Sequence, residues 1–210
     1  MEPNASLALE SVAIPVHVET PDDPRGTVVL APSAGGRWSS PSLTRLAEIF
    51  RRQGYRTVRF DFEYRAAGRA FPDPMPKCMA CYRRVVEAFH PGGPLILSGQ
   101  SMGGRVASML AAEGFPCVRL ICFAYPLHPE GQPEKLRDAH LPNLTMPTLL
   151  VNGTEDALCR RDLMEGVLAR LPANVAMHWL QGVDHSLKPA KGSGRKPSSV
   201  YEEIESVLAG

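Results

Sequence analysis

Short apolar runs alternate with amphipathic segments along most of the chain. At residues 12–18, apolar and polar positions alternate, which predicts a half-buried strand, and Pro15 favours the edge of a sheet. Apolar runs bounded by turn residues predict further strands, because a strand covered on both faces is apolar almost throughout. We expect these strands at residues 27–31, 58–62, 95–97, 120–123, 148–151 and 175–180.

Between these strands, apolar residues recur at three- and four-residue spacing, as on one face of a helix. Ser40, followed by Pro41, is expected to cap the first helix, and Ser199 with Glu202 matches a capping box for the last. Residues 65–76 are expected to be an irregular loop, and one short helix is expected near residues 134–140. The other helical stripes lie at residues 43–50, 78–89, 102–110, 163–171 and 200–208.

The order of these segments predicts the fold class. Alternating strands and helices indicate parallel strands joined by right-handed crossovers. We therefore expect an α/β fold with a mostly parallel sheet of about six to seven strands and helices on both faces. The 210 residues show no linker or repeat, so a single domain over residues 1–210 is expected.

Charge and composition limit the classes of partner. The net charge is +1, so bulk electrostatics imply no nucleic-acid and no membrane partner. The first residues lack the pattern of a secretory signal, and the five cysteines are an odd number, so we expect free thiols and a cytoplasmic protein. Cys78 and Cys81 could form a redox or zinc pair, but their position on an apolar helical stripe favours core packing.

The strand at 95–97 leads into Gly99-x-Ser101-x-Gly103 and then into a helical pattern. This order is typical of a nucleophile elbow, in which a serine is held at a strained turn between strand and helix. The glycines leave room where the strand and the helix pass each other. The alternative is a glycine-rich entry into an ordinary helix. We predict that Ser101 is a catalytic nucleophile.

A serine hydroxyl needs a base, and the base needs an orienting carboxylate. Asp156 and His185 follow the strands at 148–151 and 175–180, so we expect both at the sheet edge that carries Ser101. Glu155 and Asp162 are the alternative carboxylates. Other histidines compete less well: His178 lies within a strand, whereas His128 and His140 could line the site.

Acyl transfer also needs N–H groups that stabilise an oxyanion in the transition state. The backbone N–H of Met102, directly after Ser101, is one expected donor. The other is the N–H of Ala34, in the loop after the strand at 27–31. The alternative for this loop is a simple connection from strand to helix.

Five segments carry a resemblance to a known family: residues 30–36, 59–64, 99–105, 125–129 and 184–189. On these motifs the chain resembles small, lidless α/β-hydrolases of the dienelactone-hydrolase-like group, and more narrowly the predicted hydrolases related to the KANL3 and Tex30 proteins. The resemblance implies an α/β-hydrolase fold and a triad of Ser101, Asp156 and His185. Such proteins usually have His-Gly where this chain has Pro32-Ser33, so Ser33 could itself face the pocket.

Together these features predict a serine esterase, either a carboxylesterase or a thioesterase-like enzyme, that cleaves small ester or acyl substrates. No metal or organic cofactor is needed. The segment between residues 123 and 148 is too short for a cap domain, so an open site is expected. A basic loop beside His185 is either solvated or steers an acidic substrate. The expected wall residues are Tyr64, Arg65, Tyr125 and His128, and the basic loop carries Lys188, Lys191, Arg195 and Lys196.

One alternative function and the oligomeric state stay open at this stage. A non-catalytic interaction module with the same fold is the alternative from another functional class, because a fold alone does not define a function. The oligomeric state stays open between a monomer and a homodimer.

Overall fold

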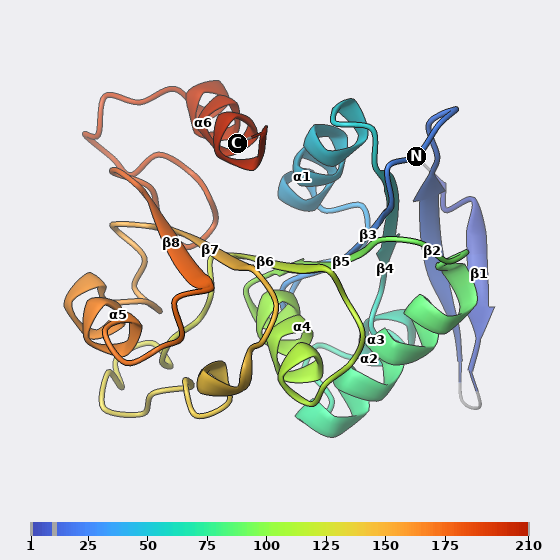
Figure 1. Ribbon diagram of the computed structural model, residues 1–210, viewed down its shortest axis with the longest axis horizontal. Coiled ribbons are helices and arrows are strands. Elements are labelled where there is room, and N and C mark those ends of the chain that lie inside the picture. The colour runs from blue at the N-terminus through green and yellow to red at the C-terminus, as the bar shows by residue number, and fades with distance from the viewer. Residues whose placement is uncertain (1, 10–11, 210) are drawn as a thin grey trace.

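The computed structural model describes residues 2–9 and 12–209, and its strands form one eight-stranded sheet (Figure 1). The remaining residues of the expected domain, Met1, Glu10, Ser11 and Gly210, lie outside the described residues. The strand order across the sheet is β1-β2-β4-β3-β5-β6-β7-β8. The pairs β1–β2 and β2–β4 are antiparallel, and every other pair is parallel.

The strands are β1 (Ala5–Ala8), β2 (Ala13–Glu19), β3 (Thr27–Ala31), β4 (Arg56–Phe60), β5 (Leu95–Gln100), β6 (Arg119–Phe123), β7 (Thr148–Gly153) and β8 (Val175–Leu180). The helices are α1 (Pro41–Arg52), α2 (Glu63–Ala66), α3 (Met75–Phe89), α4 (Met102–Ala112), α5 (Arg161–Leu168) and α6 (Pro197–Ala209), with one 3-10 turn, η1 (Leu141–Asn143). The expected alternation of strands and helices is confirmed from β3 onward.

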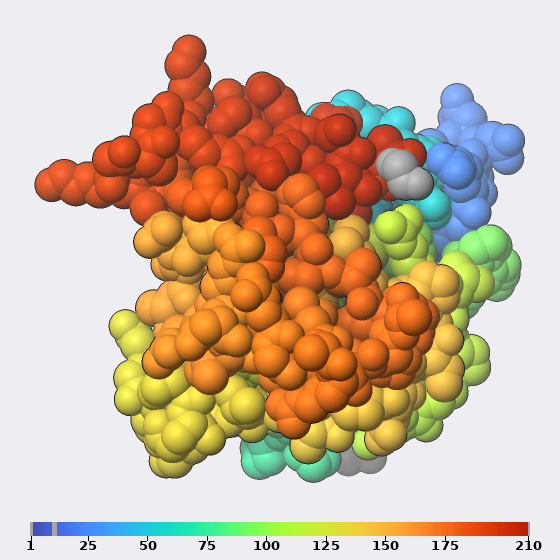
Figure 2. All heavy atoms as spheres, turned by 60° about the vertical axis from the view of Figure 1, so that its left-hand side comes forward, coloured from blue at the N-terminus to red at the C-terminus, as the bar shows by residue number. Residues whose placement is uncertain are grey.

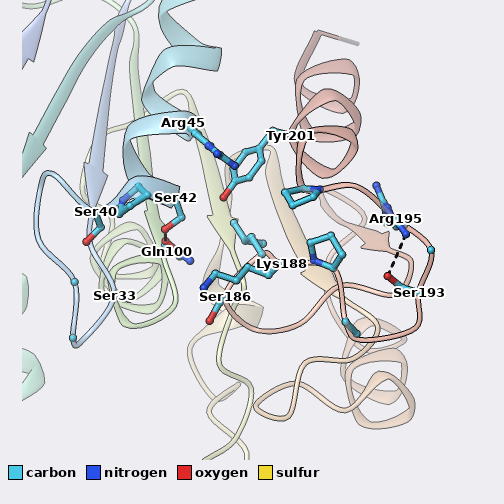
Figure 3. Close-up of a pocket in the computed structure, with 18 of the residues that line it drawn as sticks. Ser33, Ser40, Ser42, Arg45, Gln100, Ser186, Lys188, Ser193, Arg195 and Tyr201 are labelled. Carbon is cyan, nitrogen blue, oxygen red and sulfur yellow. Dashed lines mark hydrogen bonds between the residues drawn. The ribbon is translucent and has the colours of Figure 1, made fainter.

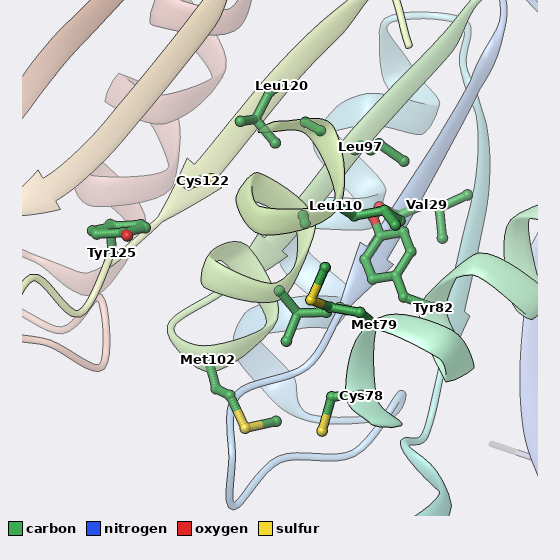
Figure 4. Packing of buried hydrophobic residues seen from close by; sticks show 14 of the residues in the cluster. Val29, Cys78, Met79, Tyr82, Leu97, Met102, Leu110, Leu120, Cys122 and Tyr125 are labelled. Atoms are coloured by element: carbon green, nitrogen blue, oxygen red, sulfur yellow. The ribbon is translucent and has the colours of Figure 1, made fainter. Parts of the chain in front are cut away.

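Helices cover both faces of the sheet, and each face has its own apolar core. Helices α1 and α6 pack on one face, and α3, α4 and α5 pack on the other (Figure 1). In the core between the sheet and helices α3, α4 and α5, Tyr82 of α3 reaches the sheet. Its hydroxyl donates to the carbonyl of Val29 at 2.6 Å (Figure 4). Burial on both faces explains why the central strands are apolar runs rather than alternating patterns.

The first two strands differ from the expectation. Strand β2 is not at the edge, because β1 pairs with it and takes that position. Pro15 is tolerated there because the register between β2 and β4 begins only at Val16, so the missing N–H breaks no bond of that ladder. The short sequence of β1 contains Leu7 as its only large apolar residue, which gives a weak strand signal. The sheet therefore has one strand more than predicted.

Other local predictions were wrong. No helix forms at residues 134–140; this segment consists of turns and irregular backbone, and Arg137 N–H donates to the carbonyl of Leu127 instead. Among the described residues between β6 and β7, only η1 is helical, so this connection contains no cap domain. The loop expected at residues 65–76 begins inside α2 and ends inside α3, which starts at Met75.

Ser40 is the N-cap residue of α1 and Pro41 its first residue, as expected, but the side chains of Ser40 and Ser199 do not form the expected cap hydrogen bonds. The Ser40 hydroxyl accepts a hydrogen bond from the N–H of Arg37, at 2.8 Å, in the loop before α1. Helix α6 begins at Pro197, so Ser199 lies within its first turn and donates to the carbonyl of Lys196. Proline at the first position is favourable in both helices, since it lacks the N–H that would otherwise need a partner.

Two further expectations concern cysteines and membranes. Cys78 and Cys81 are buried in the α3 core, as expected, and burial raises the pKa of these thiols to about 11 and about 12. Across residues 2–9 and 12–209, none of the helices combines the length and the hydropathy needed to cross a bilayer.

Candidate active site

Ser101 lies in a strained turn between β5 and α4. Its backbone has φ 54° and ψ −119°, a conformation that non-glycine residues rarely adopt. The close approach of strand and helix requires glycine, because a Cβ atom at Gly103 would lie 2.3 Å from the carbonyl oxygen of Ala31. A Cβ atom at Gly99 would lie 2.4 Å from the backbone of Gly103. The turn therefore has the geometry expected of a nucleophile elbow.

The three side chains predicted to meet do meet. His185 Nε2 lies 2.8 Å from Ser101 Oγ, across 84 residues of sequence. On the other side of the ring, His185 Nδ1 lies 2.8 Å from each carboxylate oxygen of Asp156. A carboxylate can only accept, so Nδ1 carries the proton and Nε2 is left as the acceptor for the serine hydroxyl.

Asp156 is held by its own loop and by a residue that sequence reasoning missed. Its side chain is fully buried, and Oδ1 also accepts from the N–H of Leu158 at 2.8 Å. Oδ2 accepts from Nδ2 of Asn152 at 3.2 Å. Asn152 is itself buried at the end of β7 and bonds both backbone groups of Tyr125. The signal available in the sequence was a polar side chain at the end of an apolar strand.

The loop after β3 packs against the start of α4, so the two expected N–H donors belong to adjoining segments. Met102 is the first residue of α4, and no intrahelical carbonyl faces its N–H. Ala34 lies in the loop, and its carbonyl accepts the hydroxyl of Tyr64 at 2.6 Å. Buried Asp61 accepts from the N–H of Trp38 at 2.6 Å and from the guanidinium of Arg37 at 3.0 Å. Burial raises the pKa of Asp61, although both hydrogen bonds oppose that shift.

Three of the residues expected to line the substrate pocket do not. Tyr64 and Tyr125 are completely buried, and His128 is 2% exposed. Tyr64 supports the loop of Ala34, whereas the hydroxyl of Tyr125 donates to the carbonyl of Arg137. These aromatic rings fill the core beneath the site because they have apolar neighbours and a backbone acceptor for their hydroxyl group.

His128 supports the Asp156 loop rather than the pocket. Its Nδ1 donates to the carbonyl of Pro129 at 2.9 Å, and its Nε2 accepts from the N–H of Arg160 at 3.1 Å. Its backbone N–H donates to the carbonyl of Leu158, two residues after Asp156. The contacts with Leu158 and Arg160 fix the chain that follows the carboxylate.

The other histidines and carboxylates take no part in this arrangement. His140 Nε2 lies 2.8 Å from the hydroxyl of Ser108, and burial lowers the pKa of His140 to about 4. His178 pairs with Glu203 at 2.8 Å. Asp162, the alternative carboxylate, forms an exposed ion pair with Arg160.

A cavity of about 850 Å³ opens between the start of α1 and the segment that leads into α6 (Figure 3). We call it the α1–α6 cavity. The triad residues do not line it, but three of its lining residues are direct neighbours in sequence of expected site groups: Gln100 before Ser101, Ser33 before Ala34 and Ser186 after His185. Ser33 lines this cavity, as the sequence suggested. The remaining lining residues are Gly35, Gly36, Ser40, Pro41, Ser42, Arg45, Leu187, Lys188, Pro189, Ala190, Gly192, Ser193, Gly194, Arg195, Pro197 and Tyr201.

Comparison with known protein families identifies the architecture. The family model described as "Alpha/beta hydrolase domain" matches residues 24–209, which is most of the chain. The chain belongs to the alpha/beta hydrolase domain family. The family match begins just before β3 and therefore includes every strand and loop that forms the site. Membership in this family favours hydrolase activity for the protein.

Solved structures with the same fold support this assignment. An alpha-beta serine hydrolase homologue from Coxiella burnetii has a TM-score of 0.77 and 19% identity, with 99% of this chain and 97% of that chain covered. Dienelactone hydrolase from Anabaena variabilis has a TM-score of 0.74 and 18% identity, covering 98% and 95%. An a/b serine hydrolase without lid from Xanthomonas campestris has a TM-score of 0.73 and 21% identity, covering 99% and 95%. The expected likeness to lidless, dienelactone-hydrolase-like proteins is confirmed at the level of the fold, and the narrower likeness to the KANL3 and Tex30 proteins stays a prediction.

Proposed function

We propose that this alpha/beta hydrolase is a serine esterase that cleaves small ester or acyl substrates through an acyl-enzyme. The observation that carries the proposal is the unbroken chain of hydrogen bonds from Ser101 Oγ through His185 to Asp156, each 2.8 Å long. A serine, a histidine and a buried carboxylate in this order form the arrangement that activates a hydroxyl group at neutral pH.

In the acylation step, Ser101 Oγ attacks the carbonyl carbon of the ester, and its proton moves to His185 Nε2. Asp156 stabilises the imidazolium and keeps Nδ1 protonated. The carbonyl oxygen becomes an oxyanion, which accepts hydrogen bonds from the N–H groups of Met102 and Ala34. The carbon–oxygen bond to the alcohol then breaks, and the alcohol leaves with the proton from His185. A thioester would lose a thiol in the same way.

In the deacylation step, water gives a proton to His185 Nε2 and attacks the acyl-enzyme. The second tetrahedral intermediate collapses to release the acid, and Ser101 recovers its proton from His185. The cycle uses only side chains and backbone groups of this chain, so we propose a reaction that needs no cofactor. The exposed fraction of the His185 side chain, 23%, supports access of water to the base.

The test combines turnover with covalent labelling. Wild-type protein should hydrolyse p-nitrophenyl acetate and should form a fluorophosphonate adduct on Ser101. Ser101→Ala should lose both, while Ser198→Ala, which changes an exposed serine on α6, should keep both. A protein with intact circular dichroism but neither turnover nor an adduct would overturn the proposal and favour the non-catalytic interaction module.

A further inference from the structure

The α1–α6 cavity has an unbalanced charge. Three cationic side chains line it, Arg45, Lys188 and Arg195, and none of its lining residues is a carboxylate. Lys188 extends into the cavity from the segment between β8 and α6 (Figure 3). In Figure 2 this orange-red segment projects from the body of the molecule. An open cleft lined by one sign of charge attracts ligands of the opposite sign.

Two of the three cations have no carboxylate partner among the described residues. Arg195 pairs with Glu203 at 2.7 Å. For Arg45 and Lys188, by contrast, no carboxylate of the described residues lies within 4 Å. The Arg45 guanidinium lies over the ring of Tyr201, 5.0 Å from its centroid, which holds the charge above the cavity without neutralising it.

The nearby carboxylates are engaged elsewhere. Asp184 accepts from the N–H groups of Ser186 and Lys188, at 2.8 and 3.0 Å, and so forms the turn after His185. Glu48, one turn after Arg45 on α1, pairs with Arg51 at 2.8 Å. Arg45 and Lys188 are therefore available to a ligand.

The inner end of the cavity also presents a hydrogen-bond donor. Gln100 is only 6% exposed, and its Oε1 accepts the hydroxyl of Ser42 at 2.6 Å. Its Nε2 donates to no acceptor within the part of the chain that the structure describes, and it faces the cavity (Figure 3). This nitrogen is reached by solvent, so a bound acceptor would take over the hydrogen bond that the N–H group otherwise makes to water. Gln100 directly precedes Ser101 at the end of β5, so this donor and the nucleophile belong to the same strand end.

We propose that the α1–α6 cavity binds a carboxylate or phosphate group of the substrate, with Arg45 and Lys188 as counter-charges and Gln100 as a donor. The proposal rests on the proposed esterase function and narrows its substrate class to esters that carry a negative charge. The charged group lies on either the acyl or the alcohol side of the scissile bond. Steering by these cations adds to binding at low ionic strength.

Matched pairs of esters test this. On the acyl side, p-nitrophenyl hemiadipate is compared with the same ester capped as a methyl ester, and on the alcohol side 3-acetoxybenzoate is compared with its methyl ester. In at least one pair we expect wild-type kcat/KM to be about tenfold or more higher for the anionic ester than for its methyl ester. The difference should come mainly from a lower KM for the anionic ester. The Arg45→Gln/Lys188→Gln double variant should lose that preference. Adipate and inorganic phosphate, as competitors of p-nitrophenyl acetate hydrolysis, report which anion binds more tightly.

The control and the outcomes keep the two proposals apart. Lys191→Gln removes the same charge from the same segment at an exposed position that does not line the cavity, so it should keep the wild-type preference. Equal turnover of both members of each pair by wild type, or a preference retained by the double variant, would overturn the anion site and leave the esterase intact. Absence of turnover for all esters, with no adduct on Ser101, would instead count against the esterase itself.

Discussion

The hydroxyl group of Tyr64 donates a 2.6 Å hydrogen bond to the carbonyl oxygen of Ala34 and thereby ties the loop after β3 to the segment that follows β4. Tyr64 is completely buried, so water does not compete with the Ala34 carbonyl for this hydrogen bond. Because Ala34 supplies one of the proposed oxyanion donors, Tyr64 is a positioning residue for the transition state rather than part of the substrate pocket.

Tyr64→Phe should therefore reduce catalysis more than substrate binding. We expect kcat to fall about 3- to 30-fold with KM nearly unchanged, and the free energy of unfolding to fall by about 1 kcal/mol. Steady-state kinetics and urea denaturation measure the two effects. Tyr55→Phe, at the half-buried aromatic residue before β4, is the control for hydroxyl removal. A Tyr64→Phe variant with wild-type kcat would contradict the positioning role.

Replacing the buried carboxylate of the triad should cost far more. In Asp156→Asn the amide donates where the carboxylate accepted, which favours the wrong tautomer of His185, so kcat should drop roughly 10³- to 10⁴-fold. Asp162→Asn makes the same chemical change at an exposed ion pair on α5 and should leave kcat within about twofold. Comparable losses in both variants would rule out the specific role of Asp156.

The elbow glycine Gly103 should tolerate no side chain. In Gly103→Ala the new Cβ would lie 2.3 Å from the carbonyl oxygen of Ala31, so we expect the free energy of unfolding to fall by about 2–4 kcal/mol. Gly166→Ala lies within α5, where no atom of the described residues beyond its chain neighbours and the nearby helix backbone lies within 4 Å of the new Cβ, and it should stabilise the protein by about 0.5–1 kcal/mol. Chemical denaturation of the pair provides the measurement, and equal stabilities would contradict the packing argument.

Stability should fall in mild acid through His140. Burial, and to a lesser extent Arg105, lowers the pKa of His140 to about 4 in the folded protein, whereas an unfolded histidine titrates near 6.5. Between these values the unfolded chain binds more protons, so the free energy of unfolding decreases as the pH falls from about 6.5 to 4. Allowing for partial exposure, we expect a loss of about 2 kcal/mol.

His140→Gln isolates this contribution. The variant lacks the titrating ring, so its unfolding free energy should fall less than that of the wild type between pH 7 and pH 4.5. Urea denaturation at both pH values gives the comparison. Parallel pH profiles for the two proteins would show that His140 does not contribute.

The sequence was most informative for residues whose position in the sheet follows from the order of the strands along the chain. Ser101, Asp156 and His185 each follow a strand of a parallel sheet, and parallel strands bring their carboxyl ends to one edge. The prediction that these residues meet needed no knowledge of side-chain packing. Strand β1 was missed because four residues with one large apolar side chain give almost no pattern.

The direction in which a side chain points could not be predicted in the same way. Tyr64 and Tyr125 follow strand ends, and a tyrosine there has the same sequence signal whether its ring enters the pocket or the core. Their burial depends on backbone acceptors that distant segments supply, the carbonyl groups of Ala34 and Arg137. Asn152 was missed for a similar reason, since its amide supports Asp156 through contacts that exist only after β6 and β7 are paired.

The 84 residues between the nucleophile and its base also set an order of events during synthesis. Ser101 leaves the ribosome long before His185, and the elbow can form on the central strands while its hydroxyl group is still unactivated. Esterase turnover would then begin only when β8 docks against β7. On this view, activity in a translating or refolding chain would appear only once β8 has paired with β7. Chains that have not yet formed this pair would not hydrolyse the ester.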